Sequence, residues 1–325
     1  MIADRIRLGA PGEAAADPAR PAAPAPAVGP RPPRVSIGVP VYNGAAFLAR
    51  TLEALLAQSW SDFEIIVSDN GSTDETEAIG RAFAALDSRV RYRRNPVNLG
   101  LAANYNGLVR SASGEFFKWA TADDVCRPEF VRACVTALLE SPAAVLAYPR
   151  TRFIDAAGRS LDIADPGFPL RMARPRDRLR YVMAAEHWVN AILGVIRRAA
   201  LLRTRLLPAY PGGDYVLLGE LCLQGPFVEI PAVLFERRLH PAASSQLPRH
   251  GRQLAIFFAG RDGRLVLPAW ARARDHLRTV LRSGLSVRDK AALLGAWAAD
   301  VGRRRARLAG EARIAAATLL GGRRR

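Results

Sequence analysis

The sequence predicts an α/β fold, in which a mostly parallel sheet carries helices on both faces and is followed by a helical C-terminal region. Two observations support this prediction. From residue 34 to residue 140, short β-branched runs alternate with segments of helical periodicity, a pattern typical of βαβ units with right-handed crossovers. The strands are also almost continuously apolar, as in "EIIV" (64–67), which indicates a sheet covered on both faces.

The first half of the chain contains four such units. The expected strands are residues 34–40, 63–70, 90–95 and 115–120. The expected helices are residues 46–59, the segment after "GSTDET" (71–76), residues 101–112 and residues 129–140. Ser72 or Thr73 can cap the second helix, and Pro128 suits the first turn of the fourth.

After Pro149 the pattern is less regular. Strands are expected at 151–158, 191–198 and 228–240, the last broken by a proline, with a helix near 176–186. Basic helices are expected at 277–284, 289–301 and 313–320. The predicted domains are a disordered Ala/Pro-rich arm (1–33), a main domain (34–250, with halves 34–125 and 126–250) and a basic helical region (251–325).

The net charge of +17 is unevenly distributed, because residues 270–325 contain fourteen Lys or Arg against four Asp or Glu. This tail indicates either an anionic partner or a composition bias toward arginine, since the chain has only two lysines. Nucleic acid is disfavoured because the tail lacks aromatic residues interleaved with its basic ones. An anionic membrane surface stays possible.

Cellular location is predicted from two further features. No apolar run approaches the length of a membrane-spanning helix. Cys126, Cys134 and Cys222 form no metal-binding or disulfide pattern, as expected in a reducing compartment. We therefore expect a cytoplasmic protein that is at most peripheral at the inner face of the membrane.

Several common catalytic motifs are absent from the sequence, among them the P-loop, G-x-G-x-x-G after the first strand, G-x-S-x-G and H-E-x-x-H. Three polar segments follow expected strands instead: "PVYNG" (40–44), "SDNGSTD" (68–74) and "TADD" (121–124). Ligands of open parallel sheets bind beyond the carboxyl ends of the strands. The sequence therefore predicts a binding site formed by these three segments.

Two adjacent carboxylates, Asp123 and Asp124, follow the fourth strand. Neighbouring like charges at the end of a core strand are unfavourable unless a cation faces them. A divalent metal ion is the expected cation, because carboxylate oxygens suit Mg²⁺ or Mn²⁺. The alternative is that Asp124 caps the helix that begins near Pro128.

Residues 35–148 resemble glycosyltransferase family 2, the inverting nucleotide-sugar transferases of the GT-A fold. Three parts of the chain carry the resemblance: "SIGVPVYNGAAFLARTLEALLAQSWSDFEIIVSDNGSTDET" (36–76), "NLGLAANYNGLVRSASGEFFKWATADD" (98–124) with Pro128, and, more loosely, "YPGGDYVLLGELCLQGPFVEIPAVLFERRLHP" (210–241). The resemblance implies transfer from a UDP-, dTDP- or GDP-sugar to a saccharide or lipid-linked acceptor, in the synthesis of cell-surface polysaccharide or glycoconjugate.

The resemblance also implies a metal site. The family's D-x-D motif holds the cation and its bound diphosphate, and here Thr121 occupies the first aspartate position. Asp123 and Asp124 are then left as ligands of Mn²⁺ or Mg²⁺, with His240 as a third contact. His240 is alternatively an ordinary surface or core histidine. Arg237 or Arg238 is expected near the phosphates.

For the nucleotide, the resemblance implies contacts from all three strand ends. The residues expected to bind it are Pro40, Tyr42, Asn43, Asp69, Asn98, Gly100, Asn104 and Asp123. Asp69 would accept a hydrogen bond from the nucleobase. It could also stabilise the turn of "DNG", and the two roles are compatible. Ala103 stands where many relatives place an arginine near the phosphates.

Inverting transfer requires a general base for the acceptor hydroxyl. The resemblance assigns this role to Asp214, with Gly213 where a second acid often stands. Asp214 could instead cap the helix that runs through Leu221. Weaker rivals for the base are Asp155, Asp162 and Asp165.

Two other classes of function remain open at this point. One is a nucleic-acid- or membrane-surface-binding module whose basic tail is the functional part. The other is a nucleotidyltransferase, although "PVYNG" replaces the glycine-rich, basic phosphate loop that such an enzyme uses after its first strand.

Overall fold

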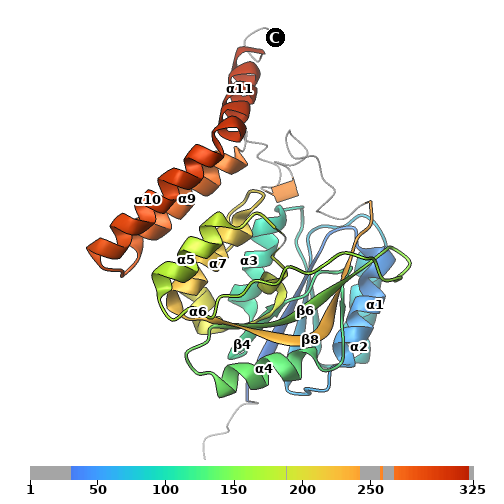
Figure 1. Ribbon diagram of the computed structural model, residues 1–325. Helices are drawn as coiled ribbons and strands as arrows, with labels where there is room; N and C mark the ends of the chain where they lie inside the picture. Colours follow the sequence, from blue (N-terminus) through green and yellow to red (C-terminus); the bar gives the residue numbers. More distant parts are fainter. Residues whose placement is uncertain (1–30, 188, 242–256, 259–266, 322–325) are drawn as a thin grey trace, which may run out of the picture. The chain divides into compact units, whose positions relative to one another are not determined.

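The computed structural model describes residues 31–187, 189–241, 257–258 and 267–321. The described residues from 32 to 321 belong to one compact unit. The predicted disordered arm, residues 1–33, lies almost entirely outside the described residues. Figure 1 shows strands flanked by helices, with the last helices of the chain, in red, extending away from the strands.

A single mixed sheet of eight strands is present in the described residues, in the order β3-β2-β1-β4-β7-β6-β8-β5. The strands are β1 (Val35–Val41), β2 (Phe63–Asp69), β3 (Val90–Arg94), β4 (Phe116–Trp119), β5 (Val125–Cys126), β6 (Leu146–Ile154), β7 (Val195–Arg197) and β8 (Phe227–Arg238). Strands β1–β4 are mutually parallel, and β7 and β5 pair antiparallel with their neighbours. The predicted α/β fold with a mostly parallel sheet is confirmed.

The helices of the main domain are α1 (Ala45–Leu56), α2 (Thr76–Leu86), α3 (Leu101–Ser111), α4 (Phe130–Glu140), α5 (Pro175–Ala184), α6 (Arg198–Leu202) and α7 (Gly213–Gln224), with the 3₁₀ helix η1 (Asn190–Leu193). Chain direction explains their placement. Strand order runs outward from β1 to β3 and then reverses to β4, so right-handed crossovers place α1 and α2 on one face and α3 on the other. The reversal creates a switch point at the carboxyl ends of β1 and β4.

The core at this point is tightly packed on both faces of the sheet. A Cβ at Gly38 would lie only 2.9 Å from Phe117 Cζ and 3.0 Å from Leu108, so glycine is required for α3 to approach β1. On the opposite face, Lys118 is fully buried, donates to the Leu193 carbonyl at 2.6 Å, and lies 4.0 Å from the centre of the Phe130 ring. These contacts fix the strand that leads into "TADD".

The second half differs in detail from the sequence prediction. Strand β6 begins at Leu146, five residues earlier than expected, and the "AIL" segment is the 3₁₀ helix η1 rather than a strand. Pro231 does not end β8. Ile230 pairs with Pro149 and Val233 with Arg150, so β8 has a bulge at the exposed Pro231. The bulge accommodates a residue that has no backbone N–H to donate to the neighbouring strand.

The C-terminal helices are α9 (Pro268–Arg282), α10 (Val287–Arg303) and α11 (Arg305–Gly321). Helix α9 packs on α7, α10 packs on α5 and α9, and α11 packs on α9. The buried Glu311 carboxylate of α11 accepts the Ala269 N–H at 3.0 Å and so satisfies the N-terminus of α9. None of the described helices is long and apolar enough to cross a membrane.

A pH-dependent contribution to stability is expected from buried His276 on α9. Burial, with the charges of Arg272 and Arg304, lowers the pKa of His276 from 6.5 to about 3. The unfolded chain takes up a proton below pH 6.5 that the native state excludes, so this stabilisation is complete above pH 6.5 and declines as pH falls toward 3. Between pH 6.5 and 4.5 the loss is up to about 2.5 kcal/mol.

Urea denaturation at pH 6.5 and pH 4.5 measures this contribution. The side chain of a His276→Gln variant can still accept from Arg272 but does not titrate, so its free energy of unfolding should decline less with pH than that of the parent chain. Equal declines in the two chains would contradict the assignment to His276.

Candidate active site

A cleft of about 490 Å³ lies at the carboxyl ends of β1 and β4, at the switch point of the sheet. Its lining comes from the end of β1, from the segments after β1, β2, β3, β4, β6 and β8, from the N-terminal parts of α1 and α3, and from Phe257. The lining residues are Pro40, Val41, Tyr42, Asn43, Gly44, Ala46, Phe47, Asn70, Asn98, Leu101, Asn104, Tyr105, Thr121, Ala122, Asp123, Ala156, His240, Pro241 and Phe257. Six of the predicted nucleotide-binding residues are therefore together: Pro40, Tyr42, Asn43, Asn98, Asn104 and Asp123.

The loop after β1 is held by the loop after β2. Asn43 adopts a positive φ of 50°, its N–H donates to Ser72 Oγ at 2.9 Å, and its Oδ1 accepts the Thr73 N–H at 2.8 Å. Ser72 and Thr73 therefore bind this neighbouring loop and do not cap α2, whose N-cap residue is Glu75. Tyr42 is left 45% exposed at the cleft, where its ring is available to a ligand.

Three asparagines that line the cleft, Asn70, Asn98 and Asn104, form hydrogen bonds within the protein. Asn70 Nδ2 donates to Asn98 Oδ1 at 2.8 Å, and Asn70 Oδ1 accepts the Leu99 N–H at 3.0 Å. Asn104 Nδ2 donates to the Ser68 carbonyl at 2.9 Å. Gly100, another predicted contact, has a φ of 82° and precedes α3, but it does not line the cleft.

Asp69 does not reach the cleft either. Its side chain is 0% exposed, its Oδ1 accepts the Ser72 N–H at 2.8 Å, and its Oδ2 accepts from the Tyr92 hydroxyl at 2.6 Å. Successive side chains of a strand point to opposite sides, so the next residue, Asn70, faces the cleft instead. The turn interpretation of Asp69 fits this geometry, and Asn70 takes its expected position.

Asp123 and His240 form a pair on the cleft wall. Asp123 Oδ2 lies 3.0 Å from His240 Nε2, and the Asp123 side chain is 28% exposed. The Phe47 ring packs against the imidazole with 4.8 Å between ring centres. One carboxylate oxygen and one imidazole nitrogen thus face the same space.

Asp124 points away from the cleft. Its Oδ1 accepts the Arg238 N–H at 2.7 Å, and its Oδ2 accepts from the Thr121 hydroxyl. Burial, reinforced by the charge of Asp123, raises the pKa of Asp124 to about 7. Asp124 therefore joins the turn after β4 to β8 and does not share a ligand set with Asp123 and His240. It does not cap α4, whose N-cap residue is Glu129.

The two arginines expected near the phosphates also differ in orientation. Arg238 is 5% exposed and donates to the carbonyls of Asp123 (2.9 Å), Asp155 and Ala156 (both 3.1 Å). It therefore binds the backbone of the cleft wall and does not line the cleft itself. Arg237 donates to Asn190 Oδ1 at 2.6 Å and lines a second cleft.

That second cleft, of about 180 Å³, shares Leu101, Tyr105 and Thr121 with the first and is therefore adjacent to it. Asp214 lines the second cleft from the first turn of α7. Its Oδ1 accepts the Tyr215 N–H at 3.0 Å, and the N-cap residue of α7 is Gly212, so Asp214 is not the cap. The rivals Asp155, Asp162 and Asp165 are absent from both described linings.

The electrostatics of Asp214 suit proton transfer. Burial raises the pKa of its carboxyl, while the Tyr215 N–H and the charges of Arg272 and Arg237 oppose the rise without cancelling it. A carboxylate whose pKa is raised is a stronger base than an ordinary carboxylate.

The sequence interpretation missed Asn70, Phe47 and Tyr105. Strand alternation after β2 could have identified Asn70 as the residue opposite in orientation to Asp69. Phe47 lies in the first turn of α1 and Tyr105 in the second turn of α3, where helical periodicity marks them only as apolar positions.

The family model for "Glycosyl transferase family 2" matches residues 36–192. An uncharacterized glycosyltransferase of Haemophilus influenzae is 32% identical over 233 residues, which cover 67% of this chain and 69% of that protein. Chondroitin synthase of Escherichia coli is 27% identical over 210 residues, 65% of this chain. The match spans only 29% of the length of that synthase.

Solved structures show the same fold. The 1–349 segment of S. aureus TarS in complex with UDP-GlcNAc superposes with a TM-score of 0.63 at 15% identity, covering 82% of this chain and 72% of that one. The mannosyltransferase PcManGT of Pyrobaculum calidifontis, in complex with GDP-Man and Mn²⁺, gives 0.53 at 19% identity, covering 89% and 76%. These likenesses confirm the expected GT-A-like fold, and with the sequence matches they lead to one conclusion: the chain belongs to glycosyltransferase family 2.

Proposed function

We propose that this protein is an inverting glycosyltransferase that moves a sugar from a nucleoside diphosphate to an acceptor hydroxyl. The observation that carries the proposal is the adjacency of two clefts, one lined by Asp123 and His240 and the other by Asp214. A donor in the first cleft would place its anomeric carbon near the junction at Tyr105 and Thr121. An acceptor in the second would then meet it beside a carboxylate.

The first cleft has the chemistry that a nucleotide sugar requires. Pro40, Tyr42 and Asn43 offer backbone and ring contacts to a nucleobase, and Asn70 lines the cleft at the position first expected of Asp69. UDP-, dTDP- and GDP-sugars all fit this description. The donor sugar would occupy the space toward Tyr105, where the clefts meet.

Asp123 and His240 fit a divalent cation, because Mg²⁺ and Mn²⁺ in phosphate sites use one or two protein ligands and complete their shell with phosphate oxygens and water. Asp123 Oδ2 and His240 Nε2 lie 3.0 Å apart on the wall, close enough to serve one ion. When bound, such an ion would neutralise charge on the leaving diphosphate. Asp124 would act by holding the turn and β8 in place.

The proposed reaction is a single in-line displacement. Asp214 accepts the proton of the acceptor hydroxyl as that oxygen bonds to the anomeric carbon. The bond between the anomeric carbon and the diphosphate oxygen breaks at the same time, and its electron pair leaves with the nucleoside diphosphate. Attack opposite to the leaving group inverts the anomeric configuration.

Ligand protection tests the donor assignment. The melting temperature of the full chain should rise with UDP, dTDP or GDP in the presence of Mn²⁺, because a ligand that binds only the native state stabilises it. ATP with the same ion serves as the control for a nucleotidyltransferase. Protection by ATP alone, or by none of the four nucleotides, would contradict the proposal.

We also propose that the acceptor is a saccharide or lipid-linked saccharide of a cell-surface polymer, met at the cytoplasmic face of the membrane. The supporting feature is a group of exposed arginines on α10 and α11: Arg303, Arg305, Arg307 and Arg313. Helix α11 has no distinct apolar face, so attraction to an anionic surface would be electrostatic, at about 1 kcal/mol per arginine.

Vesicle sedimentation tests this attachment. The full chain should sediment with vesicles containing anionic lipid at low salt and be released at roughly molar salt, where the screening length is about 3 Å. Changing the four exposed arginines to Gln should abolish sedimentation and leave donor hydrolysis intact. Truncation is a poorer test because Leu308 and Glu311 are buried against α9. If the parent chain does not sediment with the vesicles at low salt, the membrane attachment is contradicted. Composition bias toward arginine would then explain the charge.

A further inference from the structure

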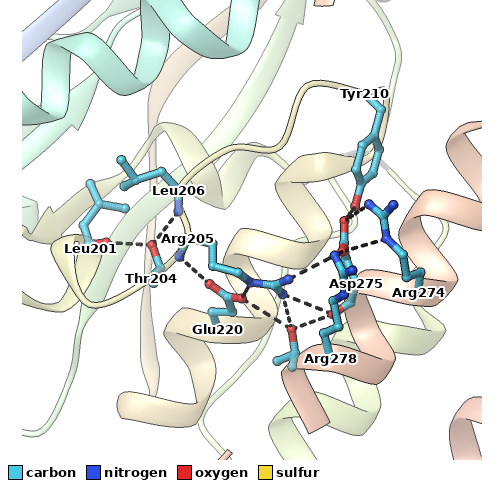
Figure 2. A network of polar contacts seen from close by, with 10 residues as sticks. Leu201, Thr204, Arg205, Leu206, Tyr210, Glu220, Arg274, Asp275 and Arg278 are labelled. Atoms are coloured by element: carbon cyan, nitrogen blue, oxygen red, sulfur yellow. Dashed lines mark hydrogen bonds and ion pairs between the residues drawn. The ribbon is translucent and has the colours of Figure 1, made fainter. Parts of the chain in front are cut away.

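Helix α9 contacts the segment that carries Asp214 on both sides of that residue. Tyr210 precedes Asp214 by four positions and Tyr215 follows it directly, and each tyrosine is held by a buried charged side chain of α9. Helices α7 and α9 pack against each other along this contact. The polar network on the Tyr210 side is shown in Figure 2.

On the first side, Asp275 holds the turn that begins α7. The Tyr210 hydroxyl donates to Asp275 Oδ2 at 2.7 Å, and both residues are about 5% exposed or less. The Tyr210 carbonyl in turn accepts the Gly213 N–H at 3.1 Å. A Cβ at Gly213 would lie 2.7 Å from Pro208, so the turn is tightly packed. Fixing Tyr210 therefore fixes the backbone immediately before Asp214.

Asp275 itself is firmly placed. Its carboxylate pairs with Arg205 at 3.4 Å, Arg274 at 3.0 Å and Arg278 at 3.3 Å, and these arginines converge on it in Figure 2. The arginine pairs and the Tyr210 hydrogen bond outweigh the effect of burial and lower the pKa of Asp275, so it stays ionised and remains an acceptor for Tyr210.

On the second side, Arg272 holds Tyr215. The Arg272 guanidinium lies 4.0 Å from the centre of the Tyr215 ring and donates to the Ala185 carbonyl at 2.8 Å. The Tyr215 hydroxyl donates to the His187 carbonyl. Arg272 is nine-tenths buried, and its charge acts on the Asp214 carboxyl.

We propose that Asp275 and Arg272 of α9 are positioning residues for the proton-accepting carboxylate Asp214, acting through Tyr210 and Tyr215. The C-terminal helix is then a part of the catalytic apparatus in addition to any role at a surface. This inference rests on the proposed function, because it takes Asp214 to be the base. A misplacement of a catalytic group by about 1 Å can lower the rate up to a hundredfold. Loss of the Tyr210 or the Tyr215 contact should therefore lower kcat.

The experiment compares Tyr210→Phe and Arg272→Gln with the parent full-length chain. Activity is measured as hydrolysis of the sugar nucleotide that the parent cleaves fastest in a panel of UDP-, dTDP- and GDP-sugars. Tyr210→Phe removes one hydroxyl and should lower kcat about tenfold, with KM within about twofold, because the donor cleft is untouched. Arg278→Gln is the matched control, since it removes an exposed partner of the same Asp275 carboxylate and should leave kcat unchanged.

The pH profile separates positioning from simple stabilisation of the fold. The charges that act on Asp214 are those of Arg272 from α9 and Arg237 from β8. The titratable groups near it are its neighbour Tyr215 and the two tyrosines of the same cleft lining, Tyr105 and Tyr210. Removing the Arg272 charge should move the acidic limb of the kcat profile to higher pH, because the carboxylate is then less favoured. A helix that only stabilises the fold would not move this limb.

A readout without turnover keeps the test decisive if Arg272→Gln folds poorly. Amide hydrogen exchange in residues 210–215 should be faster in Tyr210→Phe than in the parent and unchanged in Arg278→Gln. Normal kcat, pH profile and exchange in both variants, with Asp214→Asn inactive, would overturn the positioning role alone. An active Asp214→Asn would instead overturn the proposed base.

Discussion

Replacing Asp123 with Asn is expected to reduce donor turnover by roughly a hundredfold or more, the scale of losing one group that stabilises charge in the transition state. Asp123 is partly exposed on the cleft wall and is 3.0 Å from His240, so the substitution removes a cation-directed charge and no core volume. The melting temperature of the free protein should change little. Protection of the protein by a nucleoside diphosphate with Mn²⁺ should weaken in parallel.

Asp124→Asn is the matched control for this prediction. Its carboxylate accepts from the Arg238 N–H and the Thr121 hydroxyl and does not line the cleft, and burial already raises its pKa to about 7. A neutral amide should therefore be tolerated better here than at Asp123. Equal loss of turnover in the two variants would place both carboxylates on the ion, and near-normal turnover in Asp123→Asn would remove the proposed cation site.

Replacing Asp214 with Asn is expected to lower kcat by roughly a hundredfold to ten-thousandfold, the range of general-base catalysis, while leaving nucleoside-diphosphate affinity within about twofold. The reason is that Asp214 lines only the second cleft and moves a proton only in the transition state. Steady-state kinetics on the donor, with calorimetric titration of the nucleoside diphosphate, measure the two quantities separately.

The pH dependence gives an independent check of the same residue. Burial raises the pKa of Asp214 above that of an ordinary carboxyl, so kcat should fall as the pH drops through this raised value and the base becomes protonated. The acidic limb should vanish from whatever activity remains in Asp214→Asn. Equal losses of kcat and nucleotide affinity would instead make Asp214 a binding residue.

The main features of the site could be predicted because parallel strands bring their carboxyl ends to one edge. Tyr42 and Asn43, Asn98, and Asp123 are distant in sequence, but each follows a strand or begins a helix of a βαβ unit, and the structure places all of them on one cleft. The periodicity of the strands is enough to predict that the segments carrying Tyr42, Asn43 and Asp123 meet. Asn98 was expected only from the family resemblance.

The choice between adjacent residues was not available from the same pattern. Asp69 is buried, whereas its neighbour Asn70 lines the cleft. Asp124 is likewise buried, whereas its neighbour Asp123 lines the cleft. In each case the outcome depends on partners from other strands, Tyr92 for Asp69 and the Arg238 backbone for Asp124. Local sequence does not indicate which member of such a pair will be hydrogen-bonded in the interior and which will line the cleft.

The contact between α9 and the segment that carries Asp214 could not be predicted, for a related reason. Tyr210 and Asp275 are separated by 65 positions, and a basic amphipathic helix in an arginine-rich chain predicts a surface element. Only the packing of α9 on α7 reveals that some of its charged side chains are buried against the segment that carries Asp214.

The most direct test of the central claim is the configuration of the sugar at its anomeric carbon when it first leaves the donor. Proton NMR can follow the full chain with Mn²⁺ and an α-linked nucleotide sugar chosen from the hydrolysis panel. We expect the β-anomer to form first, because a single displacement assisted by Asp214 inverts the centre. Initial formation of the α-anomer, or cleavage between the phosphates with the sugar still phosphorylated, would contradict the account.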